Sequence, residues 1–324
     1  MTNSLNDITS CISTELKVFE NELSSCLIEK GNDSLNAILS YTFDMKGKRV
    51  RPILSFLSAG ALGKISKQTM RGALIVELLH TASLLHDDVL DNSTKRRNKQ
   101  TVNALWGNRL AILAGDYIYG KALSLIQTQE DFNLMPVYAK IAMDLPIGEI
   151  SELKATDDID VSLSTYLKVI YGKTASLIEA SVLTGMLSCG RSIEFKNQVK
   201  EFGKNLGMAF QIKDDILDYD TTTGKPKGID IKEKKITLPL IYYLEEAKKE
   251  DKQEIIDFLY SEDKTEEKVN YFLDKIIQSQ AIQKTKNKLM EHNQKALNAL
   301  EVFPNNDFTK ALKLLVQYLT IREL

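Results

Sequence analysis

The stretch that most constrains the fold is residues 77–97, where an apolar segment ends in a cluster of acids. Its first half contains no Gly or Pro, which favours a buried helix. Asp87, Asp88 and Asp91 then follow closely. On a helix, Asp87 and Asp91 lie roughly 40° apart on one face, and two carboxylates this close repel each other unless a cation lies between them. The spacing therefore indicates a site for a hard divalent cation such as Mg²⁺, which takes carboxylate and phosphate oxygens.

A second cluster of the same form, Asp214, Asp215 and Asp218, ends the apolar stretch 209–219. A single Asp-Asp-x-x-Asp group also fits an ordinary helix end with solvated acids. Two such groups, each followed by basic residues, favour Mg²⁺ ions held on a diphosphate. We therefore expect the two clusters to serve one phosphorylated substrate.

Composition sets the fold class. A chain of 324 residues that is 43% hydrophobic and contains only six Pro can bury a large core built from long helices. The formal net charge of −2 argues against nucleic acid as a partner. The sequence has no run of 18 apolar residues and no signal-peptide pattern, so we expect a cytoplasmic protein without a membrane span. No repeat or linker divides it, so we predict a single domain over residues 1–324.

Hydrophobic spacing predicts helices over 5–29, 101–126, 131–153 and 166–187. Pro136 and Pro146 should kink the third of these helices. The charged segment 236–324 contains no Gly and is also expected to be a helical scaffold.

Two basic segments suit phosphate binding. Residues 44–52 place four cations around Gly47, which indicates a turn that cradles phosphate, although a solvated charge run is the alternative. Residues 220–235 contain five Lys among Gly and Pro residues. This segment is either a lid over an anionic substrate or a surface loop.

These motifs resemble those of the trans-isoprenyl (polyprenyl) diphosphate synthases, from Lys46 to about Tyr243. The resemblance implies the all-α isoprenoid synthase fold, a large helical bundle around a deep central cavity, in a homodimer. It also implies a Mg²⁺-dependent prenyltransferase that adds isopentenyl diphosphate to an allylic diphosphate, all in trans. Membrane contact would be at most peripheral, through the product. Lys46, Asn98 and Lys234 stand where the family usually has Gly.

The resemblance implies roles for individual residues. The metal ligands would be Asp87, Asp91, Asp214 and Asp218. The residues that position isopentenyl diphosphate would be Lys48, Arg51, His80 and Arg97. The residues of the allylic half would be Arg96, Lys173, Thr174, Gln211, Lys225 and Lys235, of which Lys173, Gln211 and Lys225 would take part in the catalytic step.

Product length in this family depends on the side chains below the first cluster. Ala82 and Ser83 are small where short-chain enzymes carry bulky aromatic residues. A product tunnel should therefore continue past them to Leu79, with Tyr138 closing its far end, and we predict a hexaprenyl to octaprenyl product or a longer one. Small residues that merely permit close helix packing are the alternative.

Three other functions compete with this interpretation. A class I terpene cyclase would normally carry an Asn/Ser/Glu motif in place of the second cluster. A non-catalytic subunit of a hetero-oligomeric synthase would have lost aspartates, whereas this chain keeps all six. A short-chain synthase that makes farnesyl or geranylgeranyl diphosphate differs only in product length.

Overall fold

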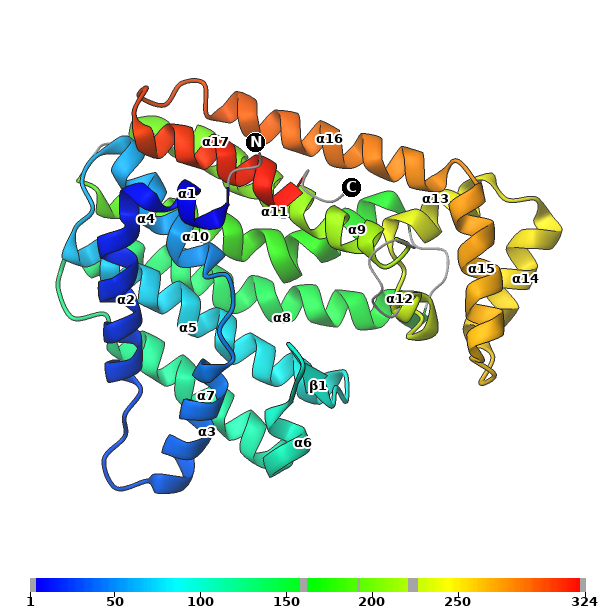
Figure 1. The fold of residues 1–324 in the computed structure, drawn as a ribbon, viewed down its shortest axis with the longest axis horizontal. Helices are drawn as coiled ribbons and strands as arrows, with labels where there is room; N and C mark the ends of the chain where they lie inside the picture. The colour runs from blue at the N-terminus through cyan, green and yellow to red at the C-terminus, as the bar shows by residue number, and fades with distance from the viewer. Residues whose placement is uncertain (1–3, 158–161, 191–192, 221–226, 321–324) are drawn as a thin grey trace. The chain divides into compact units, whose positions relative to one another are not determined.

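The computed structural model describes residues 4–157, 162–190, 193–220 and 227–320, and their regular structure is almost entirely helical (Figure 1). The all-α prediction is therefore confirmed. The chain forms two compact units that interleave along the sequence. Unit 1 comprises Met1–Ala142, Leu177–Lys200 and Val302–Leu315, and unit 2 comprises Met143–Ser176, Glu201–Glu301 and Val316–Leu324.

Unit 1 contains the N-terminal helices and a β-hairpin. Its elements are α1 (Leu5–Ile8), η1 (Ser10–Ile12), α2 (Ser13–Cys26), α3 (Asp33–Asp44), α4 (Val50–Leu62), α5 (Lys67–Leu90), β1 (Lys95–Arg96), β2 (Lys99–Gln100), α6 (Val102–Trp106), α7 (Asn108–Ser124), η2 (Asp131–Leu134) and η4 (Ile193–Phe195). Four further helices contribute residues to both units, namely α8 (Met135–Asp157), α10 (Ser176–Ser188), α11 (Lys196–Leu217) and α17 (Asp307–Thr320).

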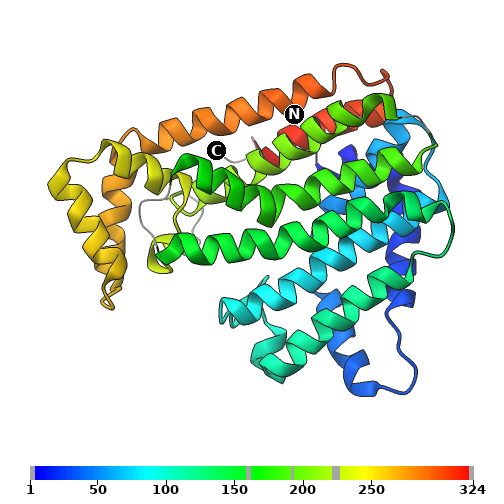
Figure 2. The ribbon, with the colours of Figure 1, turned by 180° about the vertical axis from the view of Figure 1, so that it is seen from behind.

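Helix α5 forms the centre of unit 1 and carries the first acidic cluster at its end. It packs against α4 and along α7, which lies beside it in both ribbon views (Figure 2). Its residues 72–79 are all buried, and all of them except Glu77 are apolar, as expected for a helix inside a core. Ser66 caps its N-terminus in a capping box with Thr69. A rigid, fully packed helix therefore positions the acids.

Unit 2 contains the remaining helices. They are α9 (Leu163–Ile170), the π-helix η3 (Tyr171–Ala175), α12 (Ile229–Lys232), α13 (Leu238–Glu246), α14 (Lys249–Tyr260), α15 (Glu266–Gln278) and α16 (Ala281–Ala299). One apolar core joins α13, α14 and α15, and another joins α9, α11 and α13. Pro304 lies between α16 and α17.

Several predicted helices are interrupted. The helix predicted over 5–29 has a 3₁₀ turn at Ser10–Ile12, and the one over 101–126 breaks at Gly107, whose φ of 84° no α-helix allows. The helix over 131–153 begins instead at Met135 and continues to Asp157, with Pro136 in its first turn, where no amide hydrogen is required. The helix over 166–187 contains the π-helix η3, whose extra residue the hydrophobic spacing could not reveal.

The unusual residues Asn98 and Lys234 both adopt the left-handed conformation that Gly favours. Arg97 and Asn98, with φ of 51° and 63°, form the two-residue turn between β1 and β2. Positive φ at both positions is typical of a type I′ hairpin, and Asn tolerates it better than most residues. Lys234, with φ of 60°, follows α12. There the Lys235 and Lys234 amides donate to the Asp230 and Ile231 carbonyls, the pattern of a Schellman motif.

We expect Lys234→Gly to be more stable than Lys234→Ala by about 1 kcal/mol, because only Gly adopts this conformation without strain. Both variants lose the contact of the Lys234 ammonium with the Tyr260 ring, 3.5 Å from its centroid, so the comparison isolates the backbone term. Chemical denaturation would measure the free energy of unfolding. Equal stability of the two variants would contradict the strain.

Candidate active site

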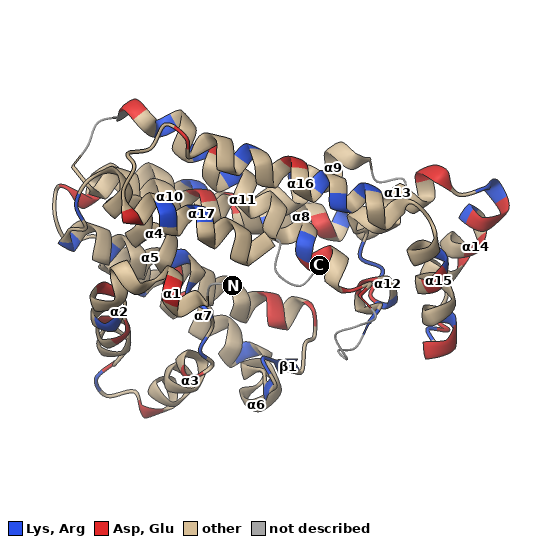
Figure 3. Cartoon of the chain, turned by 45° about the horizontal axis from the view of Figure 1, so that its top comes forward, with Lys and Arg blue, Asp and Glu red and all other residues tan. Residues whose placement is uncertain are grey.

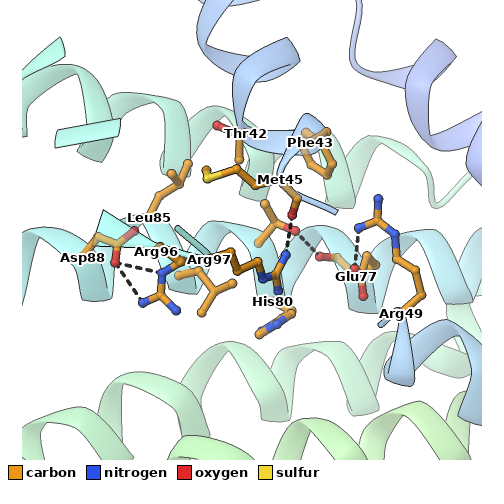
Figure 4. Close-up of a pocket in the computed structure, with 12 residues that line it drawn as sticks. Thr42, Phe43, Met45, Arg49, Glu77, His80, Leu85, Asp88, Arg96 and Arg97 are labelled. Carbon is orange, nitrogen blue, oxygen red and sulfur yellow. Dashed lines mark hydrogen bonds and ion pairs between the residues drawn. The ribbon is translucent and has the colours of Figure 1, made fainter. Parts of the chain in front are cut away.

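A small cationic pocket lies in unit 1 beside the first acidic cluster (Figure 4). Its lining residues are Thr42, Phe43, Met45, Arg49, Glu77, His80, Thr81, Leu84, Leu85, Asp88, Arg96 and Arg97. They come from the end of α3, the turn before α4, one face of α5 and the β1–β2 hairpin. Figure 3 shows the basic residues of this hairpin next to α6. The structure thus brings together four elements, of which the sequence had singled out three for phosphate binding.

Arg97 contacts the turn before α4 and stabilises it. The Arg97 guanidinium donates a hydrogen bond to the Met45 carbonyl, and it occupies the space where a side chain at Gly47 would lie. A side chain at position 47 would therefore displace the Arg97 guanidinium. Lys48 is exposed on the same turn.

His80 and Arg51 belong to this cationic environment. Burial, together with the positive charges of Arg51, Arg97 and Arg96, lowers the pKa of His80 well below its usual value, so the imidazole is neutral. Burial also lowers the pKa of Arg51 to about 10, while the Glu77 carboxylate opposes this effect. A bound diphosphate would supply negative charge next to both side chains and would favour their charged forms.

The three acids of the first cluster have different surroundings. Asp88 is buried, and its Oδ1 accepts from Arg96 Nε at 2.9 Å and lies 2.8 Å from Arg96 Nη2. Asp91 is exposed just past the end of α5, and its amide donates to the Asp87 carbonyl one turn earlier. Asp88 therefore anchors the hairpin, while Asp87 and Asp91 are better placed to bind a cation.

The residue before the cluster, His86, fixes α5 against α7. Its ring lies over Gly115, where a Cβ would collide with it. His86 Nε2 lies 3.2 Å from the Ile112 carbonyl oxygen and 3.4 Å from Asp116 Oδ1. The sequence assigned no role to His86, and the structure shows it as a packing contact.

The second cluster, like the first, combines a buried middle acid with a more exposed one. Asp214 is exposed on α11, while Asp215 is buried. Asp215 accepts hydrogen bonds from the Tyr166 hydroxyl at 2.6 Å and from Gln211 Nε2 at 3.1 Å. Gln211 Oε1 in turn accepts from the Thr174 hydroxyl at 2.7 Å. This chain of hydrogen bonds connects two predicted residues of the allylic half to the middle acid.

Asp218 holds the segment that follows the cluster. Its two carboxylate oxygens accept hydrogen bonds from the Ile229 and Asp230 amides, each at 3.1 Å. Burial and the neighbouring charges of Asp218 and Asp215 raise the pKa of Asp230 to about 8. Asp218, predicted as a metal ligand, therefore already has a structural task at the start of α12.

Lys173 and Thr174 lie in the π-helix η3, a type of helix often found at functional sites. Lys173 Nζ lies 3.0 Å from Glu149 Oε2 and also forms an ion pair with Glu152, both on α8. Burial acts to lower the pKa of Lys173, but Glu152 and Glu149 outweigh it and raise the pKa, so the ammonium stays charged.

Two glycines allow η3 to approach α8. A Cβ at Gly148 would collide with the backbone of Gly172 and Lys173, and a Cβ at Gly172 would collide with that of Gly148. The two backbones are therefore in direct contact, which brings Glu149 and Lys173 together. Neither glycine had been recognised as a packing residue.

The residues predicted to set product length are all in unit 1. Leu79 and Ala82 are fully buried, whereas Ser83 is partly exposed and donates to the His80 carbonyl at 2.9 Å. The buried Tyr138 hydroxyl and the Thr184 side chain fill the space left by Gly72. Gly72 precedes Ser83 by three helical turns, roughly 16 Å.

Two predicted loop cations remain. Lys225 lies outside the described residues, so its catalytic role stays a prediction. Lys235 lies 2.9 Å from Glu233 Oε2.

Among the described residues, no helix combines the length and apolar character needed to cross a membrane.

The acids of the two clusters that are at least partly exposed fit a hard cation in their donor chemistry. Asp87, Asp91 and Asp214 offer carboxylate oxygens, the ligands that such cations prefer. Within the described parts of the chain, no three His, Cys, Asp or Glu side chains form a complete metal site by themselves.

Comparison with known proteins identifies the family. A family model described as polyprenyl synthetase matches residues 32–276. The chain belongs to the polyprenyl synthetase family. It is 34% identical to the octaprenyl diphosphate synthase of Haemophilus influenzae over 269 residues, which are 82% of each chain. The proteins of this family are prenyltransferases, and so is this one, as predicted.

Solved structures of other polyprenyl synthetases share the fold. A decaprenyl diphosphate synthase from Rhodobacter capsulatus superposes with a TM-score of 0.94 at 26% identity over 98% of both chains. A polyprenyl synthase from Caulobacter crescentus, crystallised with calcium and isoprenyl diphosphate, gives a TM-score of 0.91 at 28% identity over 100% of this chain and 99% of that one. Of these relatives, the Haemophilus influenzae and Rhodobacter capsulatus enzymes are named as octaprenyl and decaprenyl diphosphate synthases.

Proposed function

We propose that this polyprenyl synthetase is an all-trans polyprenyl diphosphate synthase that makes a medium or long chain, of hexaprenyl to octaprenyl length or longer. The observation that carries the proposal is the cationic pocket of unit 1, which lies beside the first acidic cluster and is lined by Arg49, Arg96 and Arg97. Two diphosphate substrates explain why such a pocket and two acidic clusters occur in one chain.

The acidic clusters would hold Mg²⁺ through Asp87, Asp91 and Asp214, with Asp218 as a partial ligand, and the bound cation would stabilise the departing pyrophosphate. Calcium accompanies isoprenyl diphosphate in the Caulobacter crescentus structure, which supports a divalent cation here. Lys173, kept charged by its two carboxylates, and Thr174 would bind the allylic diphosphate.

The cationic pocket would bind isopentenyl diphosphate. Lys48, Arg51 and Arg97 would contact its phosphates, and the neutral His80 would donate or accept one hydrogen bond. Gln211, oriented by Asp215, would lie near the reacting carbon. These residues bind and orient the substrates, and none of them is an evident general base.

Purified protein incubated with Mg²⁺, isopentenyl diphosphate and a series of allylic primers would test the function. We expect isopentenyl diphosphate to be consumed and prenyl diphosphates of hexaprenyl length or longer to form. A terpene cyclase would leave isopentenyl diphosphate unused, and a short-chain synthase would stop at farnesyl or geranylgeranyl diphosphate.

Substitutions should separate the two diphosphate sites. We expect Lys48→Ala and Arg51→Ala to raise the KM for isopentenyl diphosphate about tenfold, because each removes a charged phosphate contact. Lys173→Ala should instead raise the KM for the allylic primer. Steady-state kinetics with each substrate varied in turn would measure both effects. Lys64→Ala, which removes an exposed cation of unit 1 outside this turn, is the matched control and should change neither. If Lys48→Ala altered only the allylic KM, the assignment of sites would be reversed.

We also propose that the protein forms a homodimer. Met143, Ile147, Ile150 and Leu153 repeat at helical spacing along α8, and each is at least 51% exposed. An exposed apolar stripe of this kind is typical of a protein–protein interface. Size-exclusion chromatography with light scattering should give twice the mass of the chain. The single-domain and cytoplasmic predictions remain part of this proposal.

A further inference from the structure

Arg49 was counted with the phosphate-binding cations, but the structure gives it other partners. Its Nε lies 2.7 Å from Glu20 Oε1 on α2, and its Nη1 lies 2.8 Å from Glu77 Oε1 on α5. Its Nη2 donates to Glu20 Oε2 at 3.3 Å. The planar guanidinium thus joins two helices, which a single ammonium group could not do with the same geometry.

The position of Arg49 in the chain makes this bridge important for its neighbours. Arg49 immediately follows Lys48, precedes the first residue of α4, and has a left-handed backbone with φ of 53°. A non-Gly residue in this conformation is strained and persists where its surroundings hold it. Here the ion pairs with Glu20 and Glu77 stabilise the strained conformation of Arg49.

The bridge is largely shielded from water. The side chains of Arg49 and Glu77 are 11% and 7% exposed, and that of Glu20 is 35% exposed. Glu77 also opposes the lowering of the pKa values of Arg51 and Arg97. Figure 4 shows Glu77 between Arg49 on one side and Arg97 and His80 on the other, and both Arg49 and Glu77 line the pocket. Glu20 is not among the residues that line the pocket.

We propose that Arg49, clamped between Glu20 and Glu77, is a positioning residue for isopentenyl diphosphate: it fixes the turn so that Lys48 and Arg51 point their charges at the phosphates. This inference rests on the proposed function of the pocket. Arg49 itself acts through its neighbours, because each of its three guanidinium nitrogens already donates to one of the two carboxylates.

Glu20→Gln tests the clamp from outside the pocket. The substitution keeps the shape of the side chain and removes one of the two charges that hold Arg49. We expect the Kd for isopentenyl diphosphate, measured by calorimetry without an allylic primer so that no reaction occurs, to rise about fivefold, as expected for loss of one partly exposed ion pair. The KM for the allylic primer and the kcat should stay unchanged. Arg49→Lys should show a similar loss of binding.

The matched control is Glu22→Gln, which removes a carboxylate from an exposed position on the same helix. It should leave the Kd unchanged. A double variant, Glu20→Gln with Lys48→Ala, distinguishes positioning from a general loss of stability. If Arg49 acts by positioning Lys48, the double variant should bind only slightly more weakly than Lys48→Ala alone.

Three results would overturn the inference: unchanged binding in Glu20→Gln, equal losses for both substrates, or fully additive losses in the double variant. Wild-type protein that fails to bind isopentenyl diphosphate would instead refute the proposed function of the pocket. The two failures are therefore distinguishable.

Discussion

Asp87→Ala and Asp214→Ala should each lower kcat by a thousandfold or more, equivalent to about 4 kcal/mol of transition-state stabilisation. Each substitution removes a carboxylate that would bind a metal ion at the departing pyrophosphate. Both acids are at least partly exposed, unlike the buried Asp88 and Asp215, so neither change should open a cavity or unfold the chain. Single-turnover kinetics would measure the rate, and circular dichroism with thermal melting would verify the fold.

Asp274→Ala is the matched control for these variants, because Asp274 is an exposed acid on α15 outside both clusters. Its activity should equal that of the wild type. Near-normal turnover in either Asp87→Ala or Asp214→Ala would disprove the two-cluster mechanism. The middle acids are expected to behave differently, since losing Asp88 or Asp215 would leave Arg96 or Tyr166 without a partner and lower stability as well.

Ser83→Phe should shorten the product to farnesyl or geranylgeranyl diphosphate while catalysis continues. Ser83 lies one turn below Asp87, roughly 5.4 Å along α5. An aromatic ring there would block the path of a growing tail without touching the acids. Ser83 is partly exposed and can accept the ring, whereas a Phe at the fully buried Ala82 would overpack the core of unit 1. Chromatography of the dephosphorylated products would measure their length.

Ser83→Ala provides the control, because it removes the hydroxyl but adds no bulk. Its product should match that of the wild type. Tyr138→Phe should also leave the product unchanged, because it removes only the hydroxyl beside Gly72 and keeps the ring. A wild-type enzyme that stops at farnesyl diphosphate would contradict this account of the tunnel, as would unchanged products in Ser83→Phe.

Local features of the fold and site were predictable from the sequence. Helical spacing and the scarcity of Pro can be recognised in the sequence, and they predicted the all-α class correctly. The two Asp-Asp-x-x-Asp groups predicted carboxylates one turn apart, because residues four apart on a helix share a face. The family assignment followed from the same short motifs and is confirmed.

Whether an individual acid or base is free to bind substrate was decided only by tertiary structure. The two clusters have the same sequence pattern, which does not reveal that Asp88 forms an ion pair with Arg96 or that Asp215 accepts a hydrogen bond from Tyr166. Arg49 and Lys48 are adjacent cations, but only the approach of α2 and α5 turns Arg49 into a clamp. These partners come from distant parts of the chain, and no local pattern specifies them.

Backbone geometry shows the same limit. The missing glycines at Asn98 and Lys234 were visible as departures from the family, but their left-handed conformation emerged only in the hairpin and the Schellman motif. The sequence alone determined which chemical groups are present and how far apart they lie along each helix. Tertiary packing decided which of those groups remain exposed to a substrate, because burial and ion pairing depend on contacts between elements that local spacing does not encode.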